Sequence, residues 1–541
     1  MLDISFDELK ERLQDIPQMT ISTDIYKKIV DAVNMIIKTK RSSNVVIFTD
    51  ANDVDGMCGG AIWYITLTQL GFNNIRIYGS LDRTTLPDDI CINDEQDDSV
   101  VPNGLAYATN DSNRPAIDMV ITNDVGINMD WSRCCARQLI ITDHHMIDEH
   151  KTYQPHDKQI AICIPNICGA MVSAMLSRYM VYGYKVPDEI AELAALATIA
   201  DCMPINSINQ PAIQLLYNHI RSYNVMSKAL YFLTKPYVGR FDDDTLKFFV
   251  IPKLNAPMRI HNDMRAKGEY LDWNGNKLNW QFVIKYLIKP SQLHVSLFDS
   301  INEERKAIVD NYYTKICEKM DDMIHSDAAN PTDKHCISRM DDNTSNDVSI
   351  RRGQTALEIQ IDVDRHITGL IASKLVDKMH MPVVVKGTCG CSIRGPGAME
   401  LLKANHDNLE AYGGHKEAAG FKLKTNQQLN INAHIDITPQ VNPAYFKWRD
   451  DYDHTTIKNW LIDNAPFTSN PLFIKRCVIA RTQVFKGLHT RIVDSDGYEF
   501  MYFFHVPSCQ VNDIVSITFT IGACNKVNNI CATDDTTMIE H

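Results

Sequence analysis

The sequence lacks the features of a membrane or secreted protein. It has no run of about 18 apolar residues, the length that a transmembrane helix requires. Its acidic start, residues 1–8, lacks the basic residues and apolar core of a signal peptide. The 15 cysteines include no C-x-x-C pair, so we expect neither a disulfide framework nor a zinc site. These absences predict a cytoplasmic protein with reduced thiols and no membrane partner.

The sequence also has no excess of basic residues. The chain has 54 Lys and Arg against 67 Asp and Glu, a net charge of -13. Because a phosphate-binding surface is normally basic, this charge argues mildly against nucleic-acid binding. The objection is weak, since a metal site concentrates carboxylates and its ions add positive charge that the total does not count.

The length of 541 residues, with 45% hydrophobic and 22% charged residues, is typical of a soluble globular protein of two to four domains. From residue 44 to 205, strand-like runs alternate with helix-like segments such as 59–70 and 169–182, which predicts βαβ units and a mostly parallel sheet. We expect an α/β fold with a helical segment at 1–43, a catalytic domain at 44–285, a connecting helix and linker at 286–347, a smaller α/β domain at 348–424, and an OB-like barrel at 425–541.

The finer pattern supports this division. Residues 206–325 read as largely helical, with a long connecting helix at 300–323 and a polar linker at 326–346. The smaller α/β segment has strands at 356–363 and 382–386 with a helix at 368–378 between them. Five short strands near the end indicate a small barrel, with turn signals at 496–497 and 528–529; they are 473–482, 488–493, 499–505, 514–521 and 530–533.

Four apolar runs, at residues 44–48, 120–123, 139–142 and 197–200, each end in acidic residues or histidines. If the runs are strands of one parallel sheet, their carboxyl ends share an edge, where oxygen and imidazole ligands build a two-metal hydrolytic site. An oxygen-rich set favours Mn²⁺ or Mg²⁺ over Zn²⁺. A lone aspartate in such a place is usually a cap or turn residue, but four such sites are hard to explain as caps. The residues are Asp53, Asp55, Asp124, Asp143, His144, His145 and Asp201.

These motifs, taken in order, resemble the four motifs of the DHH phosphoesterases, and among these the RecJ single-strand exonucleases. They are Asp53-Val54-Asp55-Gly56, Asp124-Val125-Gly126, Asp143-His144-His145 and Thr198-Ile199-Ala200-Asp201. Further RecJ-like segments follow in the same order. They are a small-residue helix start at 168–172, an N-A-x-G-R-like segment at 254–259, a connecting helix at 302–306, and DHH-associated segments at 369–375, 392–395, 413–415 and 418–421. The resemblance covers residues 44–424, and the RecJ type also carries an OB domain where the barrel is expected.

The resemblance implies two bound Mn²⁺ or Mg²⁺ ions, one held by Asp55, Asp124, His144 and Asp201 and the other by Asp53 and Asp124. The family usually has a histidine four positions before the first aspartate, where this sequence has Thr49. An acidic residue that often follows it is here Ala51. We therefore expect the second ion to be weakly held, unless Asp50 or a water fills in, or the enzyme to be impaired.

The histidine motif implies two further roles. His145 should point toward the scissile phosphate as a catalytic residue, or else only support His144. Asp143 is expected to orient a neighbouring histidine rather than to bind metal.

Phosphate recognition is expected from the second α/β segment. Arg394 lies between Ser392 and Gly395, and a guanidinium in a small-residue loop suits bidentate phosphate binding. Gly413 and Gly414 allow close backbone approach beside the imidazole of His415. By family position, Arg83, Asn255 and Arg259 are further candidates. For the arginines an ordinary surface role, and for the glycines a packing role, stay open.

The barrel offers a second candidate surface. Basic and aromatic residues on its expected strands could track a backbone and stack bases, although alternating aromatics more commonly form a core. The residues are Lys486, His489, Arg491, Tyr502 and Phe504.

The resemblance implies a metal-dependent exonuclease that hydrolyses phosphodiester bonds of single-stranded DNA from the 5′ end, in repair, recombination or replication. Single-stranded DNA would be its partner, with single-strand-binding or repair proteins as further candidates, and we expect a monomer. Two alternatives remain open: an oligonucleotide or cyclic-dinucleotide phosphodiesterase, and a catalytically degenerate DNA-binding scaffold.

Overall fold

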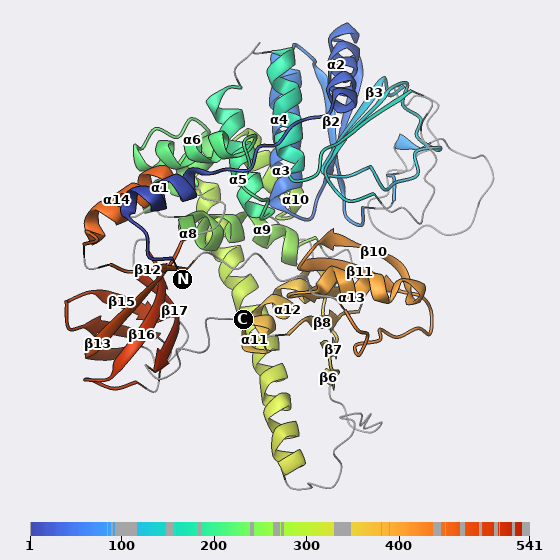
Figure 1. The fold of residues 1–541 in the computed structure, drawn as a ribbon. Helices are drawn as coiled ribbons and strands as arrows, with labels where there is room; N and C mark the ends of the chain where they lie inside the picture. The colour runs from blue at the N-terminus through green and yellow to red at the C-terminus, as the bar shows by residue number, and fades with distance from the viewer. Residues whose placement is uncertain are drawn as a thin grey trace. The chain divides into compact units, whose positions relative to one another are not determined.

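The computed structural model divides into two compact units, each built from several chain segments (Figure 1). Unit 1 comprises Met1–Ile21, Asp188–Val250 and Pro439–His541; unit 2 comprises Ser22–Pro187 and Ile251–Thr438. The domain boundaries expected from the sequence stay a prediction. The structure describes residues 2–83, 85–87, 90–91, 116–147, 156, 158–181, 186–238, 243–262, 271, 275–328, 348–379, 381–388, 390–435, 445–449, 451–465, 471–485, 489–502, 507, 509–521 and 525–532.

The first sheet of unit 2 is entirely parallel, as the alternating pattern predicts, with strand order β2-β1-β3-β4-β5. Helices α2 (Thr23–Lys38), α3 (Val54–Gln69) and α4 (Gly169–Met180) pack against it. The central strands are buried on both faces, so they read as continuous apolar runs. The strands are β1 (Asn44–Asp50), β2 (Asn74–Ser80), β3 (Met119–Asn123), β4 (Leu139–Asp143) and β5 (Gln159–Cys163).

The remaining helices of unit 2 lead to its second lobe. Helices α9 (Ile251–Ile260) and α10 (Trp280–Ile288) precede α11 (Gln292–Ala328), which is longer than the predicted 300–323. Figure 1 shows α11 as a single long helix, and it packs on α9 near its start and on α12 of the second lobe farther along. It therefore connects the two lobes of unit 2. The expected linker at 326–346 lies outside the described residues from 329 onward.

The second lobe is a mixed sheet with strand order β10-β11-β9-β8-β7-β6, in which only β7 and β8 pair in parallel. Helix α12 (Arg365–Met379) makes the crossover that a parallel pair requires. The strands and short helices are β6 (Val348–Arg352), β7 (Leu357–Ile361), β8 (Val383–Lys386), β9 (Cys391–Arg394), α13 (Ala398–Ala404), η4 (His406–Asn408), β10 (Leu409–His415) and β11 (Ala418–Leu423).

In unit 1 five strands close into a barrel, because β13 pairs with both β14 and β16. The parallel pair β15–β17 completes an OB-like arrangement, which confirms the predicted barrel. The predicted turn at 528–529 is wrong. It lies inside β17, and the pairing moves from Thr518↔Asn529 to Phe519↔Val527, so Asn528 is the extra residue of a bulge. The strands are β12 (Tyr445–Lys447), β13 (Leu472–Phe485), β14 (His489–Asp494), β15 (Glu499–Tyr502), β16 (Ile514–Thr520) and β17 (Asn525–Ala532).

The helices of unit 1 include one that the sequence pattern suggested as a strand. The run 197–200 is the last turn of α5 (Asp188–Ala200), whose alanine-rich sequence has high helix propensity. A short apolar run does not distinguish a strand from a buried helix. The other helices are α1 (Phe6–Gln14), α6 (Gln210–Arg221), α7 (Lys228–Thr234), η2 (Lys235–Tyr237), α8 (Asp243–Thr245), η3 (Leu246–Val250) and α14 (His454–Asn464). No helix among the described residues is long and apolar enough to cross a membrane.

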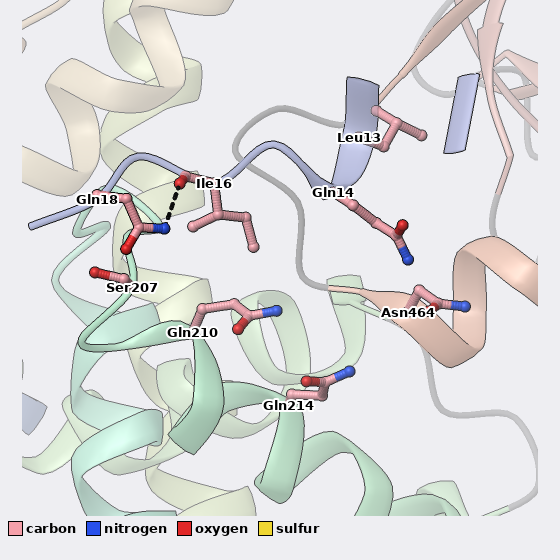
Figure 2. Close-up of a pocket in the computed structure, with 8 residues that line it drawn as sticks. All are labelled: Leu13, Gln14, Ile16, Gln18, Ser207, Gln210, Gln214 and Asn464. Atoms are coloured by element: carbon pink, nitrogen blue, oxygen red, sulfur yellow. Dashed lines mark hydrogen bonds between the residues drawn. The ribbon is translucent and has the colours of Figure 1, made fainter. Parts of the chain in front are cut away.

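Unit 1 also contains a cavity of about 420 Å³. Figure 2 shows Gln210 and Gln214 of α6 in its lining, with Gln14 from the end of α1 and Asn464 from the end of α14. Its remaining lining residues are Leu13, Ile16, Gln18 and Ser207. None of these side chains carries a charge, so the cavity offers no group for metal binding or acid–base catalysis.

Candidate metal and phosphate site

The paired aspartates lie where β1 ends and α3 begins. Asp53 is the N-cap of α3, and its Oδ1 accepts a hydrogen bond from the Gly56 N–H at 3.2 Å. Asp55 is buried, and its two oxygens accept from the N–H groups of Gly169 and Ala170, both at 2.7 Å. These donors open α4, so the Asp55 carboxylate sits at the positive end of that helix. A carboxylate held at two points is a preorganised ligand.

Asp124 follows β3 in a strained backbone conformation. Its φ of 58° is in the left-handed region, which a non-glycine residue adopts at a cost. The Asp124 N–H donates to the Thr142 carbonyl at 3.0 Å, and its Oδ1 lies 3.0 Å from His144 Nε2. Burial, and then repulsion from Asp55 and Asp53, raise the pKa of Asp124 well above its ordinary value. Negative charge is therefore crowded at this point, where a cation would be stabilised.

The Asp143-His144-His145 motif ends β4. Asp143 Oδ1 accepts from the N–H groups of His144 and His145 and lies 2.7 Å from His145 Nδ1. Although burial acts in the opposite direction, His145 and the Ile127 N–H hold the pKa of Asp143 well below its ordinary value. Nε2 of His145 lies 2.9 Å from Nη1 of Arg83, which can only donate. His145 therefore accepts at Nε2, and its ring proton is on Nδ1, toward Asp143.

The ligand atoms of these side chains fit a divalent cation. Atoms from Asp124, His144 and His145 lie within 4.8 Å of one another, and His144 Nε2 is 3.6 Å from Asp55 Oδ2. Carboxylate oxygens with a minority of imidazole nitrogens are a donor set for Mn²⁺ or Mg²⁺. Asp201 belongs to unit 1, directly after α5, so its part in the metal site stays a prediction.

The residues at the missing-histidine position have other partners. Thr49 is buried in β1, and its hydroxyl donates to the Gly56 carbonyl. Asp50 is buried beside it, with ligand atoms within 4.8 Å of those of Asp53 and Asp124. Ala51 has no side-chain ligand; its carbonyl accepts from Asn262 Nδ2 at 2.7 Å, and its N–H donates to the Ser80 carbonyl at 2.9 Å. Of these residues, only Asp50 carries a carboxylate.

Arg83 lies among the carboxylates. Its Nε and Nη2 donate to Asp50 Oδ2, the former at 2.7 Å, and Nη2 is 3.1 Å from Asp53 Oδ2. Against the effect of burial, the charges of Asp50, Asp124 and Asp53 raise the pKa of Arg83 well above its ordinary value. The structure thus places this phosphate candidate on the acidic side of the site.

An arginine cluster formed by Arg259, Arg305 and Arg394 brings positive charge from α9, α11 and β9. Nε of Arg259 is buried with no hydrogen-bond partner among the described residues. Burial lowers the pKa of Arg259, while the charges of Asp53 and Asp50 oppose the shift. Burial, followed by repulsion from Arg259, lowers the pKa of Arg394 to about 10. The same two causes lower the pKa of Arg305. Half-buried arginines that repel one another would be stabilised by a bound anion.

Arg394 and Ser392 lie in the second lobe as predicted, but both already have partners. Nη1 of Arg394 donates to the carbonyls of Ile393 at 2.8 Å and Ala419 at 3.1 Å. The Ser392 hydroxyl shares a hydrogen bond of 2.8 Å with that of Thr368. Gly369 makes room for Arg394, because a Cβ there would overlap Nη2. Sequence reasoning did not assign Gly369 this role.

The other predicted phosphate contacts are placed as follows. Asn255 lies in α9, and its Oδ1 is buried with no partner among the described residues. Gly413 has open space where a side chain would be, whereas Gly414 has φ 138° and faces Ala418 and Ala419 across the hairpin. Gly414 is thus required by the tight pairing. His415 ends β10, and its side chain lies outside what the structure describes, as do Lys486 and Phe504 of the barrel.

Several supporting residues escaped sequence reasoning. Asn123 accepts at Oδ1 from Ser173 Oγ at 2.6 Å, which ties the end of β3 to α4. Arg365 of α12 donates to the Leu81 carbonyl at 2.6 Å, which links the second lobe to the loop that carries Arg83. No local pattern marks these residues. Only the small-residue start of α4 gave a signal, since Gly169 has no Cβ to collide with the backbone of Asp124.

Comparison with known proteins agrees with this geometry. Residues 44–198 match the model of the DHH family, N-terminal domain. The chain is 23% identical over 430 residues to the single-stranded-DNA-specific exonuclease RecJ of Bacillus subtilis, covering 76% of this chain and 47% of the relative. RecJ of Thermus thermophilus is also 23% identical, over 57% of this chain and 41% of its own. The chain thus spans about half the length of these relatives.

The fold has a solved counterpart. The crystal structure of RecJ in complex with Mn²⁺ from Thermus thermophilus superimposes with a TM-score of 0.67 at 17% identity, covering 96% of this chain and 74% of that one. The structure of the same protein with Mg²⁺ gives a TM-score of 0.58 at 16% identity. Residues 44–198 therefore match the N-terminal domain of the DHH family, and the chain resembles RecJ proteins in sequence and in fold.

Proposed function

We propose that this protein is a metal-dependent exonuclease that removes nucleotides from the 5′ end of single-stranded DNA. One observation carries the proposal: within unit 2, a carboxylate and imidazole cluster lies close enough to the arginine cluster for the charge of Arg259 to act on Asp53 and Asp50. A metal site beside an anion site is the pairing that phosphodiester hydrolysis needs. The single-stranded-DNA substrate is proposed from the RecJ relatives, which are single-stranded-DNA-specific exonucleases. The 5′ direction and a role in repair, recombination or replication are proposed from the resemblance of the motifs to the RecJ exonucleases.

The acidic side of the site would position the reaction. Asp55, Asp124 and His144 would hold a divalent ion, which supplies Lewis acidity at the phosphate when bound. Asp143 holds His145 at Nδ1, so the lone pair on Nε2 points toward Arg83 and the cluster. From there His145 can accept a proton from an attacking water. Asp201 is proposed as a further ligand by its place in the fourth motif.

The arginine cluster would bind the terminal phosphate. Arg259 has an unused buried N–H, and Arg394 retains the N–H groups that do not bind carbonyls. Burial strengthens a charge-assisted hydrogen bond to phosphate, because water does not screen it. Asn255 and the backbone at Gly413 are weaker candidates beside them.

The test is a nuclease assay on long single strands labelled at the 5′ or the 3′ end, with Mn²⁺, Mg²⁺ or EDTA. We expect early release of the 5′ label, no cleavage in EDTA, and little cleavage of a blunt duplex. Preferential cleavage of dinucleotides would support the short-oligonucleotide phosphodiesterase instead. Metal binding and strand binding without cleavage would support the scaffold.

The phosphate site has its own test. Arg394→Ala should lower kcat/KM on 5′-phosphorylated strands by roughly tenfold to a hundredfold, because a hydrogen bond to a charged group contributes about 1.5–3 kcal/mol. Its loss on 5′-hydroxyl strands should be smaller, and Mn²⁺ affinity should not change. Equal losses on both strands would remove Arg394 from the phosphate site. Arg352→Ala, at the exposed end of β6, is the matched control.

A further inference from the structure

Among the described residues, the position between Asp50, Asp53 and Asp124 is the one place where three carboxylates, with no histidine, converge closely enough for an ion. The guanidinium of Arg83 already lies there. Its Nη2 contacts Asp50 Oδ2, lies 3.1 Å from Asp53 Oδ2 and 3.9 Å from Asp124 Oδ2. One side chain thus approaches all three candidate ligands with its positive charge.

Asp50 has no capacity left for a metal ion. Its Oδ1 accepts from the backbone N–H of Asn52 at 3.2 Å and from Asn52 Nδ2 at 2.6 Å. Its Oδ2 accepts from Nε and Nη2 of Arg83. An ionised carboxylate has about four lone-pair sites, and these four donors use them. Asp50 therefore anchors Arg83 and does not replace the missing histidine.

The other neighbours hold Arg83 in the same place. The backbone N–H of Arg83 donates to Ser80 Oγ at 3.1 Å, and its φ of 58° fixes the chain in the left-handed region. Nη1 lies 2.9 Å from His145 Nε2. Thr49, which could have carried a ligand, donates its hydroxyl to the Gly56 carbonyl. Contacts with Asp50, Asp53 and His145 therefore oppose displacement of the guanidinium.

The two oxygens of Asp124 face different sides of the site. Oδ1 faces His144 Nε2 at 3.0 Å, on the side of Asp55, whereas Oδ2 faces Arg83 Nη2 at 3.9 Å. A carboxylate that bridges two cations has this arrangement. Here one of the two cations is part of the chain.

We propose that this protein binds a single divalent ion, on the side of Asp55, Asp124 and His144, and that Arg83 takes the place of the second ion. The inference rests on the proposed function for the metal site but concerns the number of ions. A guanidinium stays protonated in proteins and carries one charge, so it can stabilise a phosphate oxygen without being recruited from solution. The rate of cleavage should then rise with the first power of the metal concentration before saturation, and the curve should not be sigmoidal.

The test is the stoichiometry of Mn²⁺ binding to the full chain, measured by calorimetric titration and by electron paramagnetic resonance. We expect one ion per chain and the six-line spectrum of an isolated Mn²⁺. Two ions about 3.5–4 Å apart would show exchange coupling, and that result for the wild-type protein would overturn the proposal. This measurement needs no variant, so it does not depend on the folding of one.

Two variants make the measurement of Mn²⁺ stoichiometry a more specific test. Thr49→His should still bind one ion, because Arg83 occupies the place that the new imidazole would serve. The double variant Thr49→His, Arg83→Met should bind two coupled ions, since it adds a ligand and removes the charge. Arg137→Met, which removes an exposed arginine of unit 2, should keep one ion. A second ion in Thr49→His alone, or only one in a folded double variant, would contradict the proposal.

Failure of the proposed function gives a different pattern. One ion per chain in a protein that cleaves no strand would retain the one-ion site and reject the nuclease. Binding of no ion would overturn both.

Discussion

Asp124 is the residue on which the two sides of the candidate site depend. Its left-handed backbone, its hydrogen bond to Thr142 and the absence of a side chain at Gly169 hold it against two other carboxylates. Such strain persists only where the surrounding structure fixes it, which is common at functional sites. The electrostatic repulsion around Asp124 is therefore a cost in stability that a bound cation relieves.

Replacing Asp124 by asparagine should separate these effects. The pKa of Asp124 is raised in the folded protein. The protonated Asp124 carboxyl therefore contributes fully to stability below its ordinary pKa of about 3.9, and this contribution is lost as the pH rises through the pKa of Asp124 in the folded protein. Asp124→Asn has no such loss, so without metal it should melt at a temperature at least equal to that of the wild type near pH 7. Mn²⁺ should raise the melting temperature of the wild type only, and the variant should not cleave. Thermal unfolding in EDTA and in Mn²⁺ across pH 4–8 measures this. A variant that Mn²⁺ still stabilises would remove Asp124 from the metal site.

At the scale of elements, the start of α4 supports the site. Its first two N–H groups bind Asp55, and this close approach requires glycine at position 169. The arrangement connects residues 114 positions apart in the sequence. The helix thus acts as a structural support whose exact position determines metal affinity.

Gly169→Ala should weaken metal binding. Its Cβ would lie 2.8 Å from Asp124 Cβ and 2.9 Å from the Asp124 backbone nitrogen, so α4 must move and its hydrogen bonds to Asp55 must lengthen. We expect the Mn²⁺ dissociation constant to rise at least about tenfold, equivalent to about 1.4 kcal/mol. Gly420→Ala, whose Cβ would meet only one carbonyl at 3.7 Å, is the control. Equal Mn²⁺ affinities in the two variants would reject this role of α4.

The barrel contains a buried ion pair of its own. Lys475 of β13 donates to Asp494 Oδ2 at 2.5 Å and to Asp496 Oδ2 at 2.6 Å, and Asp494 is fully buried. Although burial acts in the opposite direction, these carboxylates raise the pKa of Lys475 above its ordinary value. The pair therefore stabilises the fold fully below the ordinary lysine pKa of about 10.4, and this contribution is lost as the pH rises through the folded value.

Lys475→Met should destabilise the barrel at pH 7 by about 3–5 kcal/mol, because it leaves a buried carboxylate unpaired. It should also lose part of the alkaline destabilisation that we expect for the wild type above pH ~10.4. Denaturant unfolding at pH 7 and pH 11 measures both effects. Lys422→Met removes an exposed ion pair with Glu410 and should change stability by about 1 kcal/mol or less. A similar small change in Lys475→Met would show that the pair contributes little.

For the whole molecule, the net charge of -13 does not describe the surface that would meet a nucleic acid. The negative charge is partly concentrated in the metal cluster, and the positive charge in the arginine cluster of Arg259, Arg305 and Arg394. Binding should therefore depend on a few arginine contacts and not on a broad basic surface. Strand affinity should consequently respond less to salt than that of a basic DNA-binding protein.

Salt dependence tests this directly. Three phosphate contacts to a single strand predict a slope of about -2 for the logarithm of the association constant against the logarithm of salt concentration. Fluorescence anisotropy with a labelled strand, at constant divalent ion and with a non-cleaving variant, gives the slope. Arg259→Ala should reduce its magnitude by about 0.7. A slope steeper than about -5 would require many more contacts than the arginine cluster provides.

The sequence by itself determined the elements and the chemistry of the site. Buried parallel strands must be apolar along their length, so Asp124 and Asp143 stood out where those runs ended, and the closed barrel followed from five short strands. Where a short apolar run had two possible structures, as at residues 197–200, the local signal was insufficient and the strand prediction was wrong.

Only the tertiary structure decided how the charges are paired. Nothing near Arg83 in the sequence indicates that it binds Asp50, 33 residues away, or that Arg365 reaches Leu81, 284 residues away. Nor does the sequence show that Asn52 and Arg83 use the lone pairs of Asp50. Such partners depend on how folded elements pack, because side chains that are distant in sequence meet only once the backbone has brought them within hydrogen-bond distance.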